Sequence, residues 1–114
     1  MSGPRVEYQI RPLTERQVQS AVVDFFRDAG LIVIVTSQDR AARKQLEGLT
    51  DLIVVGHGRV LFVECKAPMG QLRESQIQFY DNIFEHLGSH VQYTVLWQPE
   101  QARPWLDWFE GQRA

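Results

Sequence analysis

The sequence predicts a mixed α/β domain whose elements follow the order αβββαβα. Two segments with the apolar spacing of amphipathic helices, residues 15–29 and 72–87, stand on either side of three runs rich in β-branched residues. A fourth such run and a short aromatic segment follow the second helix. The chain has 114 residues, 44% of them apolar and 23% charged, which suits one compact domain over residues 1–114.

The first helix is predicted over residues 15–29. Its apolar residues recur at intervals of three and four, and they are Val18, Ala21, Val22, Phe25, Phe26 and Ala29. Thr14 and Gln17 fit a reciprocal capping box at the start, and Gly30 supplies a stop at the end. The run LIVIVT at residues 31–36 then predicts a short strand that is buried on both faces.

A β-hairpin is predicted in the middle of the chain. The runs DLIVV (51–55) and RVLFVECK (59–66) are separated by Gly-His-Gly, which places His57 and Gly58 at the tip of a two-residue turn. In that register Ile53 faces Phe62, and Asp51 faces Glu64. The preceding segment, residues 37–50, lacks periodicity, and a loop of this length in so small a domain is usually functional.

The last third of the chain predicts a helix, a strand and a short terminal helix. The helix spans residues 72–87, ends at Gly88, and has an inward face formed by Gln76, Tyr80, Ile83, Phe84 and Leu87. Residues 91–97 predict the fourth strand. The terminal helix follows Pro104 and contains Trp105, Trp108 and Phe109.

Composition excludes several classes of protein. No apolar run approaches the roughly 20 residues needed to cross a bilayer, and the first twelve residues lack the order of a signal peptide, so we expect no membrane association and a cytoplasmic location. The single cysteine, Cys65, rules out an intrachain disulfide and a CxxC zinc site. With 12 basic and 14 acidic residues, composition alone does not point to nucleic acid.

The hairpin register brings charged residues together. Opposed residues have Cβ atoms about 4.5–5.5 Å apart, so Asp51 and Glu64 would lie side by side. Lys66 projects from the same strand face as Glu64 because side chains alternate along a strand. The rest of that face is apolar, which favours the core over water, and its residues are Ile53, Val55, Val60 and Phe62. The competing interpretation is a solvated Glu64–Lys66 pair at an exposed edge.

Two buried carboxylates are costly unless a divalent cation lies between them. Mg²⁺ prefers oxygen ligands and commonly bridges to phosphate, so the pattern points to phosphodiester chemistry. Helical spacing adds further polar residues to this predicted site. Glu15, with Gln19 one turn later, lies on the apolar face of the first helix, and Gln76 lies on the inward face of the second. The alternatives are that Glu15 only favours the helix dipole and that Gln76 is a satisfied amide at the rim of the core.

Three segments together resemble a known family. GLTDLIVV (48–55), LFVECK (61–66) and GQLRESQ (70–76) are similar to the motifs of the PD-(D/E)XK nuclease superfamily, and within it to the VRR-Nuc (virus-type replication-repair nuclease) family. The resemblance covers residues 15–97. It implies a restriction-endonuclease-like core, with a four-stranded mixed β-sheet flanked by helices, in a single VRR-Nuc-like nuclease domain.

The resemblance also implies a role for each site residue. The metal ligands for Mg²⁺ or Mn²⁺ would be Asp51, Glu64, Glu15 and the Cys65 backbone carbonyl. Lys66 would orient or help deprotonate the attacking water, and Gln76 matches the glutamine of the helix that follows. Thr50 departs from the proline that the family often has before the aspartate, and we expect it to be tolerated because proline offers no ligand there.

The activity implied is metal-dependent hydrolysis of DNA, on branched substrates such as four-way (Holliday) junctions in DNA repair. Neutralising three carboxylates at a metal would change the formal net charge from −2 to +1, so the acidic balance does not exclude DNA. The residues expected to contact the DNA backbone are Arg40, Arg43, Lys44 and Arg73, with Arg59 near the site. For the loop residues among them, a solvated connection is the alternative.

Cutting two strands requires two copies of so small an enzyme, so we expect a homodimer. An apolar dimer surface is one interpretation of Trp97, Trp105, Trp108 and Phe109, and core packing is the other. Three other functions stay open. They are a restriction-type duplex endonuclease, a non-catalytic DNA-binding assembly module, and a structural domain whose acids are incidental.

Overall fold

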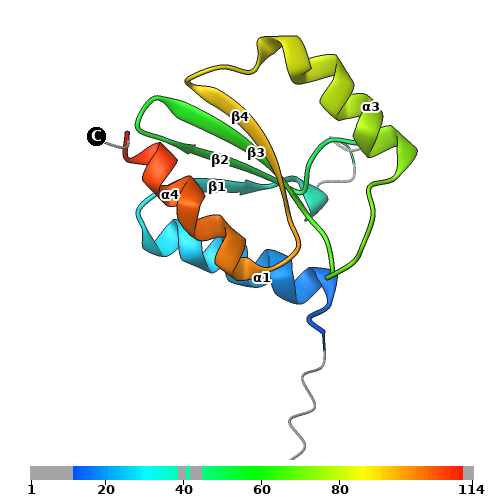
Figure 1. The fold of residues 1–114 in the computed structure, drawn as a ribbon, viewed down its shortest axis with the longest axis horizontal. Helices are drawn as coiled ribbons and strands as arrows, with labels where there is room; N and C mark the ends of the chain where they lie inside the picture. The colour runs from blue at the N-terminus through cyan, green and yellow to red at the C-terminus, as the bar shows by residue number, and fades with distance from the viewer. Residues whose placement is uncertain (1–11, 39–40, 42–44, 112–114) are drawn as a thin grey trace, which may run out of the picture.

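The computed structural model describes residues 12–38, 41 and 45–111, and it has a mixed α/β fold (Figure 1). The strands are β1 (Ile32–Val35), β2 (Leu52–Gly56), β3 (Arg59–Cys65) and β4 (Val91–Leu96). The α-helices are α1 (Glu15–Asp28), α3 (Glu74–Ile83) and α4 (Arg103–Phe109). Short 3₁₀ turns are η1 (Thr36–Gln38), η2 (Phe84–His86) and η3 (Pro99–Ala102). The predicted α/β class is therefore confirmed.

The four strands form one mixed sheet in the order β1-β2-β3-β4. The first two pairs are antiparallel, whereas β3 and β4 are parallel and are connected through α3. The predicted hairpin register is confirmed, because Ile53 pairs with Phe62. His57 and Gly58 both have positive φ, 50° and 73°, which a tight turn between twisted antiparallel strands requires.

Helix α1 forms as its spacing predicts. Thr14 and Gln17 make the reciprocal capping box, and the helix ends at Asp28, one residue before the predicted end. Its apolar stripe is buried against the sheet, with Val18, Val22 and Phe26 fully inaccessible to solvent. Burial of this stripe fixes the orientation of α1 about its own axis. That orientation determines which side chains of its first turn face the sheet.

The main core lies on the face of the sheet that α1 and α4 cover, while α3 lies on the other face (Figure 1). Its strand residues are Val33, Leu52, Val54, Leu61, Val63, Cys65 and Leu96. Phe26 of α1 and Phe109 of α4 meet here, with ring centroids 6.1 Å apart. The expectation that Ile53, Val55, Val60 and Phe62 face the core is thus wrong, since these four are only half-buried.

The reason is that α3 makes a narrow cover. The Phe79 ring of α3 lies 5.7 Å, centroid to centroid, from the Phe62 ring of β3. The Tyr80 ring of α3 lies 4.8 Å from the Tyr93 ring of β4, so these ring contacts reach only β3 and β4. Over β1, the side chains on this face meet solvent, and Ile32 and Ile34 are 63% and 48% exposed. The prediction that this strand is buried on both faces is therefore wrong, because β1 is an edge strand with one covered face.

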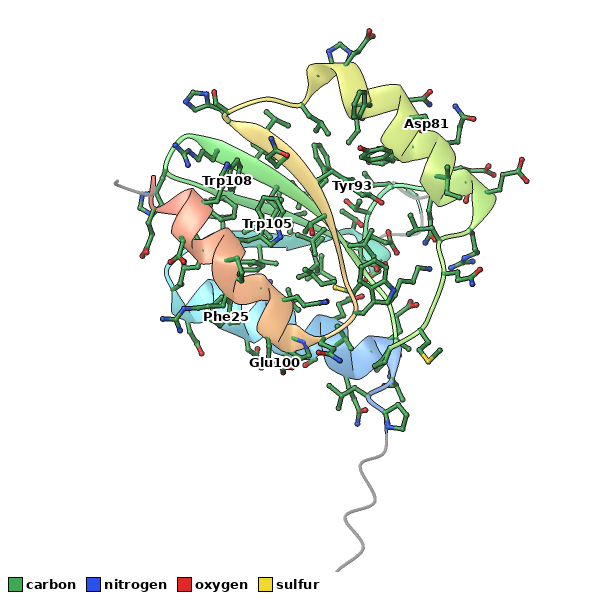
Figure 2. All side chains as sticks on the ribbon, viewed as in Figure 1. Phe25, Asp81, Tyr93, Glu100, Trp105 and Trp108 are labelled. Carbon is green, nitrogen blue, oxygen red and sulfur yellow. The ribbon has the colours of Figure 1, made fainter. Side chains whose placement is uncertain are left out.

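Two further boundaries differ from the predictions. The second helix begins at Glu74 and gives way to η2 after Ile83, which turns Phe84 outward, where it is 60% exposed. The terminal helix begins at Arg103, so Pro104 lies inside its first turn, where the missing N–H costs nothing. Within it, Phe109 is fully buried and both tryptophans pack against the core, as labelled in Figure 2.

Candidate active site

The hairpin places three of the predicted site residues at one end of the sheet. Asp51 immediately precedes β2, Glu64 is the penultimate residue of β3, and Lys66 directly follows that strand. All three are buried, with exposed fractions of 4%, 1% and 4%. The Asp51 Oδ2 atom accepts a hydrogen bond from the Cys65 amide at 3.0 Å, so its carboxylate faces the end of β3, as the register predicted.

The Lys66 amine joins this end of the sheet to α1. Its Nζ atom lies 3.9 Å from Glu15 Oε1 and 4.0 Å from Glu64 Oε2. Glu15 is in the first turn of α1 and its side chain is 46% exposed, so the Glu15–Lys66 pair marks the border between solvent and the buried carboxylates. A buried ammonium group requires such partners, because an unpaired charge in the interior is very costly.

Gln76 approaches the same carboxylate from α3. Its Nε2 atom donates to Glu64 Oε2 at 2.9 Å, and its Oε1 atom accepts from the Arg73 amide at 2.7 Å. The second bond belongs to the cap at the start of α3. The cap therefore fixes the orientation of the amide, which in turn orients the Glu64 carboxylate. The prediction that Gln76 faces inward holds, and the structure brings it into contact with Glu64.

Gly48 lets the loop before Asp51 lie directly against the start of α3. Its φ is +78°, a conformation that L side chains rarely adopt. A Cβ atom built at Gly48 would be 1.9 Å from the Ser75 carbonyl oxygen. No side chain fits between two backbones at that distance, so glycine here determines how closely the Asp51 loop and the Gln76 helix approach one another.

Two buried threonines hold the backbone at Asp51. The Thr36 amide donates to the Asp51 carbonyl at 2.9 Å, and the Thr36 hydroxyl donates to the Thr50 carbonyl. The Thr50 hydroxyl in turn donates to the Leu52 carbonyl at 3.0 Å. These hydrogen bonds fix the backbone on both sides of Asp51. Sequence analysis did not single out Thr36, and no periodicity or motif marks it.

Burial governs the ionisation of two nearby groups. Burial, and then the charges of Asp51 and Glu64, raise the pKa of the Cys65 thiol well above its usual range. Its side chain lies in the core as expected, so the thiol is protonated and is no nucleophile. Burial, followed by the charge of Glu64, likewise raises the pKa of Tyr93, a residue of β4 whose side chain lies against α3 (Figure 2).

An open groove of about 850 Å³ begins at this cluster and follows α1. Glu15, Asp51 and Arg73 line its end at the site, so Arg73 is near the site as predicted. Arg59 is not, because it lies at the far end of β3, about 20 Å from Lys66, where its guanidinium stacks 5.3 Å from the Trp108 ring centroid. Arg40, Arg43 and Lys44 lie outside the described residues.

The donor chemistry of the cluster suits a hard cation. Among the residues that the structure describes, no group of three or more His, Cys, Asp or Glu side chains is placed to hold a metal ion. Mg²⁺ does not require such a cage, since it is commonly bound by one or two carboxylates together with waters and substrate phosphate. Asp51, which lines the end of an open groove, and Glu64 provide two buried carboxylates, so the residues present fit this mode of binding.

No protein-family model, curated protein sequence or solved structure matches this chain. In the part of the chain that the structure describes, none of the helices has the length and apolar character needed to span a membrane.

Proposed function

We propose that this protein is a metal-dependent endonuclease that hydrolyses phosphodiester bonds in DNA. One observation carries the proposal: a lysine amine lies within about 4 Å of carboxylates from two elements, beside a second buried carboxylate and an open groove. Buried charged side chains gathered beside a groove mark a candidate functional site, because burying a charge costs folding free energy unless a partner offsets it. An incidental cluster of acids would be placed in solvent, where the charges cost nothing.

Each residue has a part that its contacts support. Asp51 and Glu64 would hold Mg²⁺ or Mn²⁺, with Glu15 and the Cys65 carbonyl as further oxygen ligands. When bound, the ion would supply Lewis-acid polarisation of the phosphate and a lower pKa for an attacking water. Lys66 would orient an attacking water and offset the negative charge that develops on the phosphoryl oxygens. Gln76 fixes the Glu64 carboxylate in one orientation through its bond to Oε2.

The substrate we propose is branched DNA, such as a four-way junction, cut by a homodimer. The described residues contain one such cluster, and paired incisions in two strands require two. Of the tryptophans considered for a dimer surface, Trp105 and Trp108 pack against the core while remaining half-buried, and the Trp97 indole donates to the Gly70 carbonyl at 2.7 Å. The branched substrate and the homodimer depend on the resemblance to the VRR-Nuc family.

A cleavage assay tests the proposal. The purified chain is incubated with end-labelled four-way junction, flap, linear duplex and single-stranded DNA, each with Mg²⁺, Mn²⁺ or a chelator. We expect metal-dependent, paired cuts in the junction. Metal-dependent cleavage of every substrate would support the nuclease and overturn the branched preference. Binding without cleavage under all conditions would overturn the nuclease in favour of a non-catalytic DNA-binding module.

A further inference from the structure

The groove that begins at the site continues along one face of α1. The side chains that α1 contributes to its wall recur with helical spacing, and beyond Glu15 they are Arg16, Gln19, Ser20, Val23, Asp24 and Arg27. The opposite wall includes Val35 at the end of β1 and Ser37 within η1. The Gln19 amide and the Ser37 hydroxyl meet across the groove at 2.9 Å. The groove is therefore lined mainly by polar side chains, its two walls are joined by this hydrogen bond, and Asp51 lies at one end.

Arginines occur at intervals along this groove. Arg73 lies at the site, Arg16 is on the first turn of α1, and Arg27 is near its last turn. Arg16 and Arg27 are both exposed and lie three helical turns apart, a span of about 16 Å. One Arg27 Nη atom donates to the Val33 carbonyl at 3.1 Å, which holds the side chain against the groove wall and uses one of the five N–H donors of the guanidinium group.

The lining favours an extended polyanion over an apolar ligand. Val23 and Val35 are its apolar members, and Asp24 is the acid that lies away from the site. Guanidinium, hydroxyl and amide donors are the groups with which proteins contact DNA phosphates. At about 3.4 Å per nucleotide along a strand, 16 Å corresponds to roughly five nucleotides. The groove thus matches a short run of sugar-phosphate backbone.

We infer that this groove carries the DNA strand on one side of the scissile phosphate, with Arg16 and Arg27 as phosphate-contacting residues. The inference rests on the proposed function and extends it, because it assigns a path and two contact residues outside the catalytic cluster. Sequence analysis missed both arginines, although their separation of eleven residues places them on one helix face.

Binding measurements on the full chain test the path. Fluorescence anisotropy with a labelled four-way junction, in chelator to prevent cleavage, would compare wild type with Arg16→Ala, Arg27→Ala and the matched control Arg103→Ala, an exposed arginine of α4 outside the groove. We expect each groove variant to weaken binding about threefold to tenfold and to lower the salt slope by about 1, while the control stays at wild type. Groove variants that match the control in both readings would overturn the inference.

A second variant separates a lost phosphate contact from lost packing. Arg27→Lys removes the guanidinium hydrogen bond to the Val33 carbonyl but keeps the charge, so it should retain a salt slope close to wild type. If Arg27→Lys instead lowers the salt slope as much as Arg27→Ala does, the effect comes from the lost hydrogen bond to β1. That result would overturn the phosphate contact of Arg27.

Cleavage by the same variants separates the two proposals. If wild type cleaves and the groove variants bind and cleave like the control, the path is wrong and the nuclease stands. If wild type never cleaves while Arg16 and Arg27 still govern binding, the path stands and the nuclease is wrong.

Discussion

The two faces of β3 carry different kinds of side chain. On one face Leu61, Val63 and Cys65 are fully buried among apolar side chains of α1 and α4. On the other face, the strand passes from the half-buried Phe62 to the buried carboxylate of Glu64, with Lys66 directly beyond. Apolar burial contributes about 25 cal/mol per Å² to folding, whereas burying a charge costs free energy unless a partner offsets it.

At the end of the sheet that holds Asp51 and Glu64, burial of charge costs folding free energy, which the partners of these carboxylates must offset. Glu64 is held by the Gln76 amide and the Lys66 amine, and Asp51 by the Cys65 amide. Replacing buried ion pairs with packed apolar residues is often neutral or stabilising, so a cluster of this kind is better explained by chemistry than by folding. The apolar face stabilises the fold, and the polar end is where we propose the active site.

Leu61→Ala should have the largest effect on stability. It removes a fully buried side chain from the apolar face and should lower the free energy of unfolding by about 2–5 kcal/mol. Chemical denaturation measures this, with Val60→Ala as the control from the half-buried opposite face. Equal losses for the two variants would contradict the division of β3 into two faces.

Gly48→Ala should affect both regions. A left-handed backbone conformation costs an L residue about 1–2 kcal/mol, and the close approach to the Ser75 carbonyl adds to that loss. Gly58→Ala is a matched control, since Gly58 has a similar φ of +73° but nothing within 4 Å of its Cβ position. We expect Gly48→Ala to be the less stable variant and to lose cleavage activity at temperatures where it stays folded. Similar stability and activity in the two variants would show that the contact with α3 is unimportant.

Metal binding should stabilise the polar end. At a concentration ten times the Kd, a ligand specific to the folded state adds about 1.4 kcal/mol to the free energy of unfolding. For a domain of this size, that raises the Tm by roughly 5–10 °C. Thermal unfolding with Mg²⁺ or Mn²⁺ should show the shift in wild type and in the control Asp107→Asn, an exposed acid of α4, but not in Asp51→Asn. No shift in wild type would favour a structural domain whose acids are incidental.

Cys65→Ala should have the smallest effect. The core loses one sulfur atom, which should cost about 1 kcal/mol, and cleavage should stay close to wild type because the proposed ligand is the backbone carbonyl. Since burial raises the pKa of the thiol, Cys65 should react slowly with a thiol reagent at pH 8 in the folded chain and rapidly after denaturation. Loss of cleavage in a folded Cys65→Ala chain would contradict this account.

Local rules predicted much of the fold and which side chains meet at the candidate site. The capping box and the three-and-four spacing placed α1, and a two-residue turn set the hairpin register that brings Asp51 to the end of β3. Helical spacing also placed Glu15 and Gln76 toward the sheet, where they contact Lys66 and Glu64. These features depend on residues close in sequence, which is why pattern alone suffices.

The features that could not be predicted depend on contacts between distant segments. Alternation along β2 and β3 gives apolar residues on both faces, so it cannot say which face α1 and α4 cover. The edge position of β1 likewise depends on the order of strands in the sheet. The contact of Gly48 with Ser75 requires the loop and α3 to be placed first. The groove along α1 exists only once β1 lies beside that helix.

The most direct test is cleavage of a labelled four-way junction with Mn²⁺ or Mg²⁺ by wild type, Asp51→Asn, Lys66→Ala and the control Asp107→Asn. Removing a group that stabilises the transition state typically costs about a hundredfold or more. The account predicts at least such a loss in the first two variants, with fold and much of the DNA binding retained, and no loss in the control. Wild-type cleavage by both Asp51→Asn and Lys66→Ala would contradict the assignment of the active site.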